Sequence, residues 1–84
     1  MNVAQKQTIR QMLQDGVVEI EFVKRDGSLR TLVGTLNMDT IPTDKHPLGT
    51  GRPKPPEVQT VFDLEIEEWR SFRWDTLQSW VKVS

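Results

Sequence analysis

All five prolines of this 84-residue chain lie between Pro42 and Pro56. Proline has no backbone N–H to donate to a β-ladder, so a segment this rich in proline cannot form the interior of a sheet. Gly49 and Gly51 fall in the same stretch. We therefore expect residues 37–57 to form an exposed, flexible loop that joins two structured parts of the chain.

The part before the loop begins with a helix-like segment. Residues 3–14 place Ile9 and Leu13 on one side at helical spacing, with Val3 earlier on the same side, and polar residues fill the other side. Gly16 suits the left-handed position that ends many helices. We expect this amphipathic helix to cover one open end of a sheet. A helix that binds a partner is the alternative.

From residue 17 the period of the apolar residues changes to two. The side chains expected on the buried face are Val18, Ile20 and Phe22. Asp26-Gly27 predicts a hairpin turn, because both residues tolerate positive φ. The chain then returns through residues 29–36, which are rich in β-branched residues. Gly34 inside this second strand indicates a bulge or a sharp bend.

A second hairpin is expected after the proline-rich loop. Its first strand covers Thr60 to Ile66, its turn is Glu67-Glu68, and its second strand runs from Trp69 to Trp74. Asp75 is placed to cap a short helical turn, and residues 80–83 form a last strand. The sum is a mainly β fold: a small antiparallel SH3/Sm-like barrel with an N-terminal α-helix, one domain over residues 1–84.

Composition excludes several classes of site. The chain has no cysteine, so disulfides and thiolate metal sites are excluded. Its single histidine, His46, lies in the loop, which makes a histidine metal site or a catalytic triad improbable. With no catalytic constellation, we expect a non-enzymatic protein without metal or cofactor. No apolar run is long enough to span a membrane and no signal peptide is recognisable, so we expect a cytoplasmic protein that does not bind membranes.

Eleven basic residues stand against twelve acidic ones, and the net charge is −1. Proteins that bind nucleic acid by general attraction to phosphate usually carry a basic excess. Any such role must therefore depend on a local patch. Gly49 to Lys54 superficially resembles a phosphate-binding loop, but it lacks the Walker spacing and the following helix.

The strongest candidate for a binding surface is the run from Trp69 to Asp75, which holds three of the six aromatic residues and two arginines. Alternation along a strand puts Arg70 on the face of Phe72 and Trp74, and Arg73 on the opposite face with Trp69. Arginine beside aromatic rings is a combination that stacks on bases or anchors partners.

Each of these residues also has a purely structural interpretation. We expect Phe72 to pack in the core and Trp69 to be the exposed aromatic. Arg70 could lie over an aromatic ring. The two arginines could instead form ion pairs, which contribute little when exposed. The candidate partners are Asp63, Glu65 and Glu67.

Several motifs of the chain resemble the WYL-like group of Sm-like, SH3-type barrels, and more narrowly its small members encoded by tailed bacteriophages. Phe62-Asp63-Leu64 stands where the larger family carries its Trp-Tyr-Leu signature, and Arg70 to Asp75 matches the family pattern Arg-x-Phe-Arg-x-Asp. The first hairpin, residues 18–30, adds to the resemblance, which covers roughly residues 5–80. It implies a module that senses nucleic acid or nucleotide-like ligands through a basic pocket. The positions implied are Arg70 and Arg73, supported by Arg30.

Two functions from different classes remain open. The first is a regulatory module that binds single-stranded nucleic acid or a nucleotide-like ligand through Arg30, Trp69, Arg70 and Arg73. The second is a protein-interaction module that docks on a host protein and modulates it. Either could form a homo-oligomer, because Sm-like folds assemble by pairing exposed edge strands. We favour the first, which rests on the arginine and aromatic hairpin.

Overall fold

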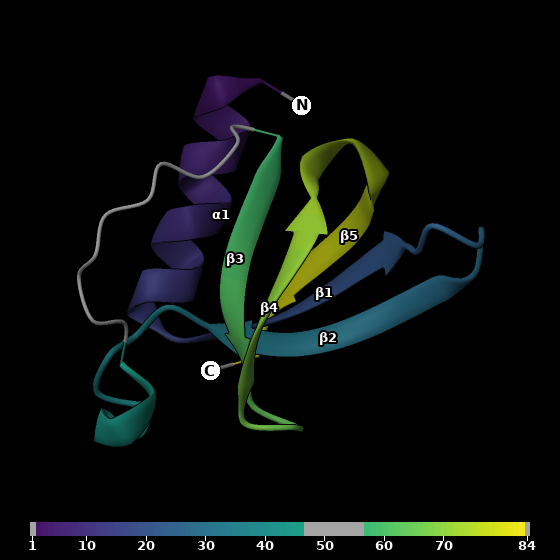
Figure 1. Cartoon of the computed structure of the whole chain (residues 1–84). Coiled ribbons are helices and arrows are strands. Elements are labelled where there is room, and N and C mark those ends of the chain that lie inside the picture. The colour runs from purple at the N-terminus through teal and green to yellow at the C-terminus, as the bar shows by residue number, and fades with distance from the viewer. Residues whose placement is uncertain (1, 47–56, 84) are drawn as a thin grey trace.

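The structure is a computed structural model that describes residues 2–46 and 57–83. Figure 1 shows one helix lying along a strongly curved sheet. The elements are α1 (Val3–Asp15), β1 (Val17–Val23), β2 (Leu29–Thr35), the 3₁₀ turn η1 (Thr43–Lys45), β3 (Val58–Asp63), β4 (Glu68–Arg73), the 3₁₀ turn η2 (Trp74–Thr76) and β5 (Leu77–Lys82).

The five strands of the described residues form one antiparallel sheet in the order β4-β3-β2-β1-β5. β1 and β2 pair along their whole length, whereas β2 and β3 pair only at Gly34 and Thr35. This short contact lets the sheet curve around a common core (Figure 1). The expected mainly β fold with an N-terminal helix is confirmed.

Helix α1 begins with a capping box. Asn2 and Gln5 each accept a hydrogen bond from the other's backbone N–H, which satisfies two donors at the helix start. Two residues of the predicted apolar side, Ile9 and Leu13, are fully buried. Val3 was expected on that side, but it lies in the first turn beyond the sheet and is 67% exposed.

The end of α1 is fixed by a side chain from the sheet. Gly16 ends the helix with an extended φ of −179°, so the predicted left-handed cap is wrong. The Thr35 hydroxyl oxygen of β2 lies 2.7 Å from the carbonyl oxygen of Gly16 and 3.1 Å from that of Leu13. It also accepts a hydrogen bond from the backbone N–H of Asn37. Thr35 is fully buried, and it therefore ties the helix to the strand.

The β1–β2 hairpin uses a three-residue loop. The backbone N–H of Gly27 donates to the carbonyl oxygen of Lys24. Gly27 has a φ of +89°, whereas the φ of Asp26 is negative. The backbone N–H of Lys24 in turn donates to the carbonyl oxygen of Ser28, which is the pattern of a type I turn followed by a glycine bulge. The turn is therefore where Asp-Gly predicted it, but only the glycine adopts positive φ.

Of the two alternatives predicted at Gly34, a bulge or a sharp bend, the bulge is wrong. Gly34 stays in register with Val18 on one side and with Asp63 on the other. The irregularity lies instead between Glu21 and Phe22, where β1 pairs with β5. Gly34 is required by packing: a Cβ atom there would lie 3.2 Å from the carbonyl oxygen of Phe62 and closer still to two side chains.

The second hairpin is shifted from its predicted position. β3 begins at Val58 and ends at Asp63, so the turn comes earlier than Glu67-Glu68, and Glu68 already pairs with Asp63. Asp63 ends the strand because its carboxylate accepts the backbone N–H of Glu65. Glu67 closes the loop with a φ of +55°.

The last predicted elements are also displaced. Asp75 was expected to cap a helical turn, but it lies inside η2, and no side chain caps that turn. The side chain of Asp75 is bound to Arg73 instead. β5 begins at Leu77, three residues before the predicted start, because it pairs with β1 as far as Phe22.

The first half of the proline-rich segment is folded. Residues 38–46 form turns that bury Ile41, and the His46 Nε2 atom lies 2.9 Å from the carbonyl oxygens of both Met38 and Ile41. The expectation of an exposed loop is therefore wrong at Ile41, whereas residues 37–46 contain no strand, as expected. The phosphate-loop-like sequence of residues 49–54 lies outside the described residues.

The core lies between α1 and the inner face of the sheet. Within the core, the ring of Phe72 packs against the rings of Phe22 and Trp74, with 5.9 and 5.2 Å between the ring centroids. The expectation that Phe72 packs in the core is confirmed. The other buried members are Ile9, Leu13, Val18, Ile20, Leu32 and Val61.

Candidate functional site

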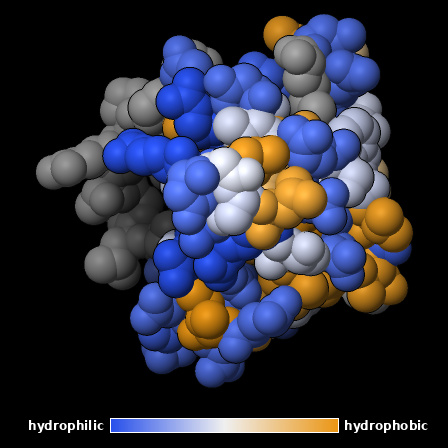
Figure 2. Space-filling model, turned by 90° about the vertical axis from the view of Figure 1, so that its right-hand side faces the viewer, coloured by the Kyte–Doolittle hydropathy of each residue, from blue (hydrophilic) through white to orange (hydrophobic). Residues whose placement is uncertain are grey.

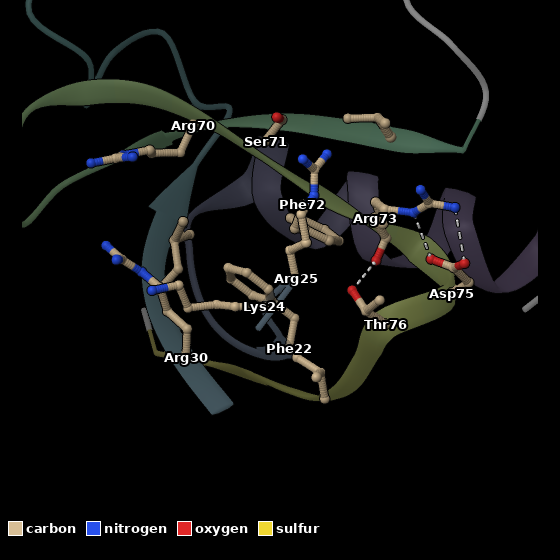
Figure 3. A pocket seen from close by; sticks show the side chains of 13 residues that line it. Phe22, Lys24, Arg25, Arg30, Arg70, Ser71, Phe72, Arg73, Asp75 and Thr76 are labelled. Atoms are coloured by element: carbon tan, nitrogen blue, oxygen red, sulfur yellow. Dashed lines mark hydrogen bonds and ion pairs between the residues drawn. The ribbon is translucent and has the colours of Figure 1, made fainter. Parts of the chain in front are cut away.

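A cleft of about 550 Å³ opens between the β1–β2 hairpin and strand β4 (Figure 3). Its apolar floor is formed by Phe22, Leu32, Val58 and Phe72, and five basic side chains stand around it. These are Lys24, Arg25, Arg30, Arg70 and Arg73, whereas Asp75 is the one acidic residue of the lining. A volume of this size is typical of a site for one small organic ligand.

The basic side chains reach the cleft from three places in the chain. Lys24 and Arg25 follow β1 directly and enter the tight turn closed by Gly27. Arg30 lies opposite Phe22 in the β1–β2 register, so both side chains are on the inner face at the mouth of the barrel. Arg70 lies opposite Val61, whose side chain is in the core.

Arg73 reaches the same cleft although strand alternation placed it on the opposite face from Arg70. It is the last residue of β4, where the chain leaves the strand and turns into η2. Its guanidinium donates to both carboxylate oxygens of Asp75, at 3.1 and 3.2 Å. These hydrogen bonds lower the pKa of Asp75 and raise that of Arg73, to which the nearby charge of Glu57 also contributes. Both side chains are exposed, so the ion pair contributes little to stability, and its main effect is to orient the guanidinium group of Arg73.

Arg30 is held by a different carboxylate. Its guanidinium nitrogen lies 3.9 Å from an oxygen of Asp63, whose side chain is only 3% exposed. This distance is too long for a hydrogen bond, so the contact with Asp63 leaves the guanidinium N–H donors of Arg30 available to a ligand. Asp63 was one of three candidate ion-pair partners of Arg70 and Arg73, but within the described residues it pairs with Arg30.

The structure brings together three of the four predicted site residues, Arg30, Arg70 and Arg73, and leaves Trp69 outside the cleft. Trp69 was expected to be the exposed aromatic, but it is half-buried. Its ring packs edge-on against Phe62, at 5.5 Å between centroids, and its indole N–H donates to the carbonyl oxygen of Lys45 at 2.7 Å. Trp69 therefore anchors η1 to the sheet.

The contact predicted between Arg70 and an aromatic ring is also absent from the described residues. The cations that lie over a ring there are Lys6 and Arg10 of α1, at 5.9 and 5.5 Å from the Trp74 centroid. Arg10 is further held by a hydrogen bond to Gln59 of β3. Trp74 thus belongs to the contact between α1 and the sheet.

The sequence reasoning missed Lys24 and Arg25 as site residues. From the sequence, these residues were assigned only to the turn. Because a tight turn fixes the backbone on either side of it, two consecutive cations beside one are restricted in position and could have been recognised as a candidate site. Arg30 on the face of Leu32 was a second signal, because a charged residue on an inner face marks the open end of a barrel.

Figure 2 shows the side of the molecule on which this turn lies, where a few apolar residues surface among predominantly hydrophilic ones.

Two other kinds of site find no support in residues 2–46 and 57–83. No group of three or more histidine, cysteine, aspartate or glutamate residues there could hold a metal ion. No helix in that part of the chain is long and apolar enough to cross a membrane.

Comparison with known proteins gives two matches. Residues 6–78 match the family model WYL_2, described as a Sm-like SH3 β-barrel fold. The chain is also 35% identical over 83 residues to an uncharacterized 11.5 kDa protein in the Gp31–cd intergenic region of Enterobacteria phage T4. That match covers 92% of this chain and 78% of the phage protein. No solved structure matches. Because the family model spans most of the chain and agrees with the five-stranded barrel and its helix, this protein belongs to the WYL_2 family.

Proposed function

We propose that this protein is a non-enzymatic regulatory module that binds single-stranded nucleic acid or a nucleotide-like ligand in the cleft. One observation carries the proposal: five of the eleven basic residues line a single cleft, although the whole chain has a net charge of −1. A cluster of cations on a protein that is slightly negative overall indicates a local site for an anion. The phage relative suggests that the module acts in the cytoplasm of an infected host cell.

The chemistry of the lining suits a phosphate attached to a flat ring. Guanidinium groups bind phosphate oxygens through two parallel hydrogen bonds, and their planes also stack on bases. Phe22 and Phe72 are buried to more than nine-tenths, so they offer little ring surface to a ligand. Stacking would therefore fall to the exposed guanidinium group of Arg25, with the apolar floor beneath.

Catalysis is not part of the proposal. Asp75 is the carboxylate that lines the cleft, and its pKa is lowered by the hydrogen bonds from Arg73. A general acid near neutral pH needs the opposite shift.

The experiment is a fluorescence anisotropy titration with labelled 12-nucleotide single-stranded DNA and RNA at low and moderate salt. We expect saturable binding that weakens with salt, and a loss of affinity of roughly 10- to 100-fold in Arg70→Ala, since one charged hydrogen-bonding group is worth about 1.5–3 kcal/mol. Lys82→Ala is the matched control, because Lys82 is an exposed cation of β5 outside the cleft.

Two results would contradict the proposal. One is no binding by the wild-type protein at low salt, and the other is equal losses in the Arg70 and Lys82 variants. Circular dichroism of each variant confirms that the fold is intact.

A second candidate function is docking on a host protein. It is favoured by Val81 and Val83, which are 61% and 57% exposed at the edge strand β5. Exposed apolar residues beside an unpaired strand edge are suited to a protein contact, either with a host protein or with another copy of this chain. Val81→Asp should abolish capture of a host protein without affecting oligonucleotide binding. Size-exclusion chromatography with light scattering of the same variant tests self-association.

A further inference from the structure

The cleft is not uniform in charge along its length. Arg70 and Arg73 are three residues apart on β4, which separates them by about 10 Å along an extended strand. Arg30 belongs to the Arg70 end, because it pairs with Asp63. In the sheet, Asp63 lies two positions from Val61, the partner of Arg70.

Cations therefore dominate one end of the cleft. In Figure 3 the charged groups of Lys24 and Arg30 extend toward the same side as that of Arg70. Among the described residues, neither Lys24 nor Arg70 forms a salt bridge, and the acidic partner of Arg30 is buried and 3.9 Å away. We name Lys24, Arg30 and Arg70 the cationic end.

At the other end of the cleft, carboxylates offset the positive charge of the basic side chains. Arg73 is occupied by Asp75, which turns toward it in Figure 3. The negative charge of Glu57 adds slightly to the raised pKa of Arg73, so Glu57 also lies near this end. A small hollow that continues past this point is lined by Glu57 and Asp75 with Lys6 and Trp74. A phosphate that followed the cleft to this end would meet two carboxylates as well as Lys6 and Arg73, so it would find no excess of positive charge among these four side chains.

We propose that the cleft binds one nucleotide, or the terminal nucleotide of a strand, in a single orientation: the phosphate lies at the cationic end and the edge of the base faces Asp75. This inference rests on the proposed function and adds the size, the direction and the selectivity of the ligand. A strand that continues through the cleft is disfavoured, because its next phosphate would lie beside Asp75 and Glu57.

The carboxylate of Asp75 also predicts which bases bind. An ionised carboxylate only accepts hydrogen bonds. Each oxygen of Asp75 accepts one from Arg73, which leaves further lone pairs for a ligand. The exocyclic amine of cytosine is a donor that carboxylates accept in known recognition, whereas uracil places a carbonyl oxygen there. Cytosine should therefore be preferred to uracil, and adenine to hypoxanthine for the same reason.

The test is competition against the labelled 12-nucleotide DNA by unlabelled cytidine and uridine 5′-monophosphates. We expect both to displace the DNA, with the cytidine nucleotide about fivefold stronger, the value of one hydrogen bond of about 1 kcal/mol. Asp75→Asn should remove this preference, because an amide both donates and accepts. Arg70→Gln should weaken both nucleotides equally. Lys82→Gln is the control that should change neither.

The outcomes separate this inference from the function on which it rests. If the 12-nucleotide DNA binds but neither mononucleotide displaces it, the cleft follows a continuous strand, and the inference is wrong while the function stands. If Asp75→Asn tightens both nucleotides equally, Asp75 only repels phosphate, and the base-facing role is wrong. If the DNA itself does not bind, the function and the inference fail together.

Discussion

At the scale of single residues, Gly34 shows how tightly the barrel closes. A Cβ atom there would lie 2.8 Å from Leu32 Cδ2, 3.1 Å from Val61 Cγ2 and 3.2 Å from the carbonyl oxygen of Phe62. We expect Gly34→Ala to lower the free energy of unfolding by about 1–3 kcal/mol, the usual cost of overpacking a core. Urea denaturation measures this change. Leu32→Val removes the nearest atom, so the double variant should lose less than the sum of the two single losses. A fully additive pair would show that Leu32 is not the obstacle.

At the scale of elements, the β1–β2 turn holds Lys24 and Arg25 in place, and its geometry depends on Asp26. The carboxylate accepts the hydroxyl of Ser28 at 2.6 Å and its backbone N–H at 3.0 Å, which lowers the pKa of Asp26. A lowered folded-state pKa means that this stabilisation is complete above the unfolded-state pKa and is lost as the pH falls through the folded-state pKa. Ser28→Ala should therefore raise the pKa of Asp26, measured by NMR titration of its carboxyl carbon between pH 2 and 6. An unchanged pKa would contradict this account of the turn.

At the scale of the whole molecule, the net charge of −1 provides no general attraction for an anion, so binding depends on a local cluster of cations such as that of the cleft. Because Lys24, Arg30 and Arg70 bind a single phosphate in the proposed complex, the slope of log K against log salt should be about −0.7, the contribution of one neutralised phosphate of a single strand. Anisotropy titrations between 50 and 300 mM salt measure this slope. A slope of zero would remove the phosphate contact from the proposal, and a slope steeper than about −2 would require phosphate contacts beyond the cleft.

Local patterns in the sequence were sufficient for the elements and the fold class. The helix, the first hairpin and its Asp-Gly turn were correctly predicted because their signals lie within a few neighbouring residues. The errors came where a distant partner decides the outcome. β5 begins at Leu77 because β1 extends the pairing to Phe22. Ile41 is buried and the segment around it is folded, held in part by Trp69, 28 residues later.

In the candidate site, too, local patterns predicted some residues and distant contacts decided the others. The sequence by itself determined that Arg70 and Arg73 accompany a core aromatic, Phe72, on one strand, and the resemblance added Arg30. Only the tertiary structure decided that Lys24 and Arg25 join them, that Trp69 does not, and that Asp75 occupies Arg73. The physical reason is that residue spacing fixes which side chains share a face of one strand. Which faces then meet across a cleft depends on the curvature and register of the whole sheet, and no local pattern encodes these.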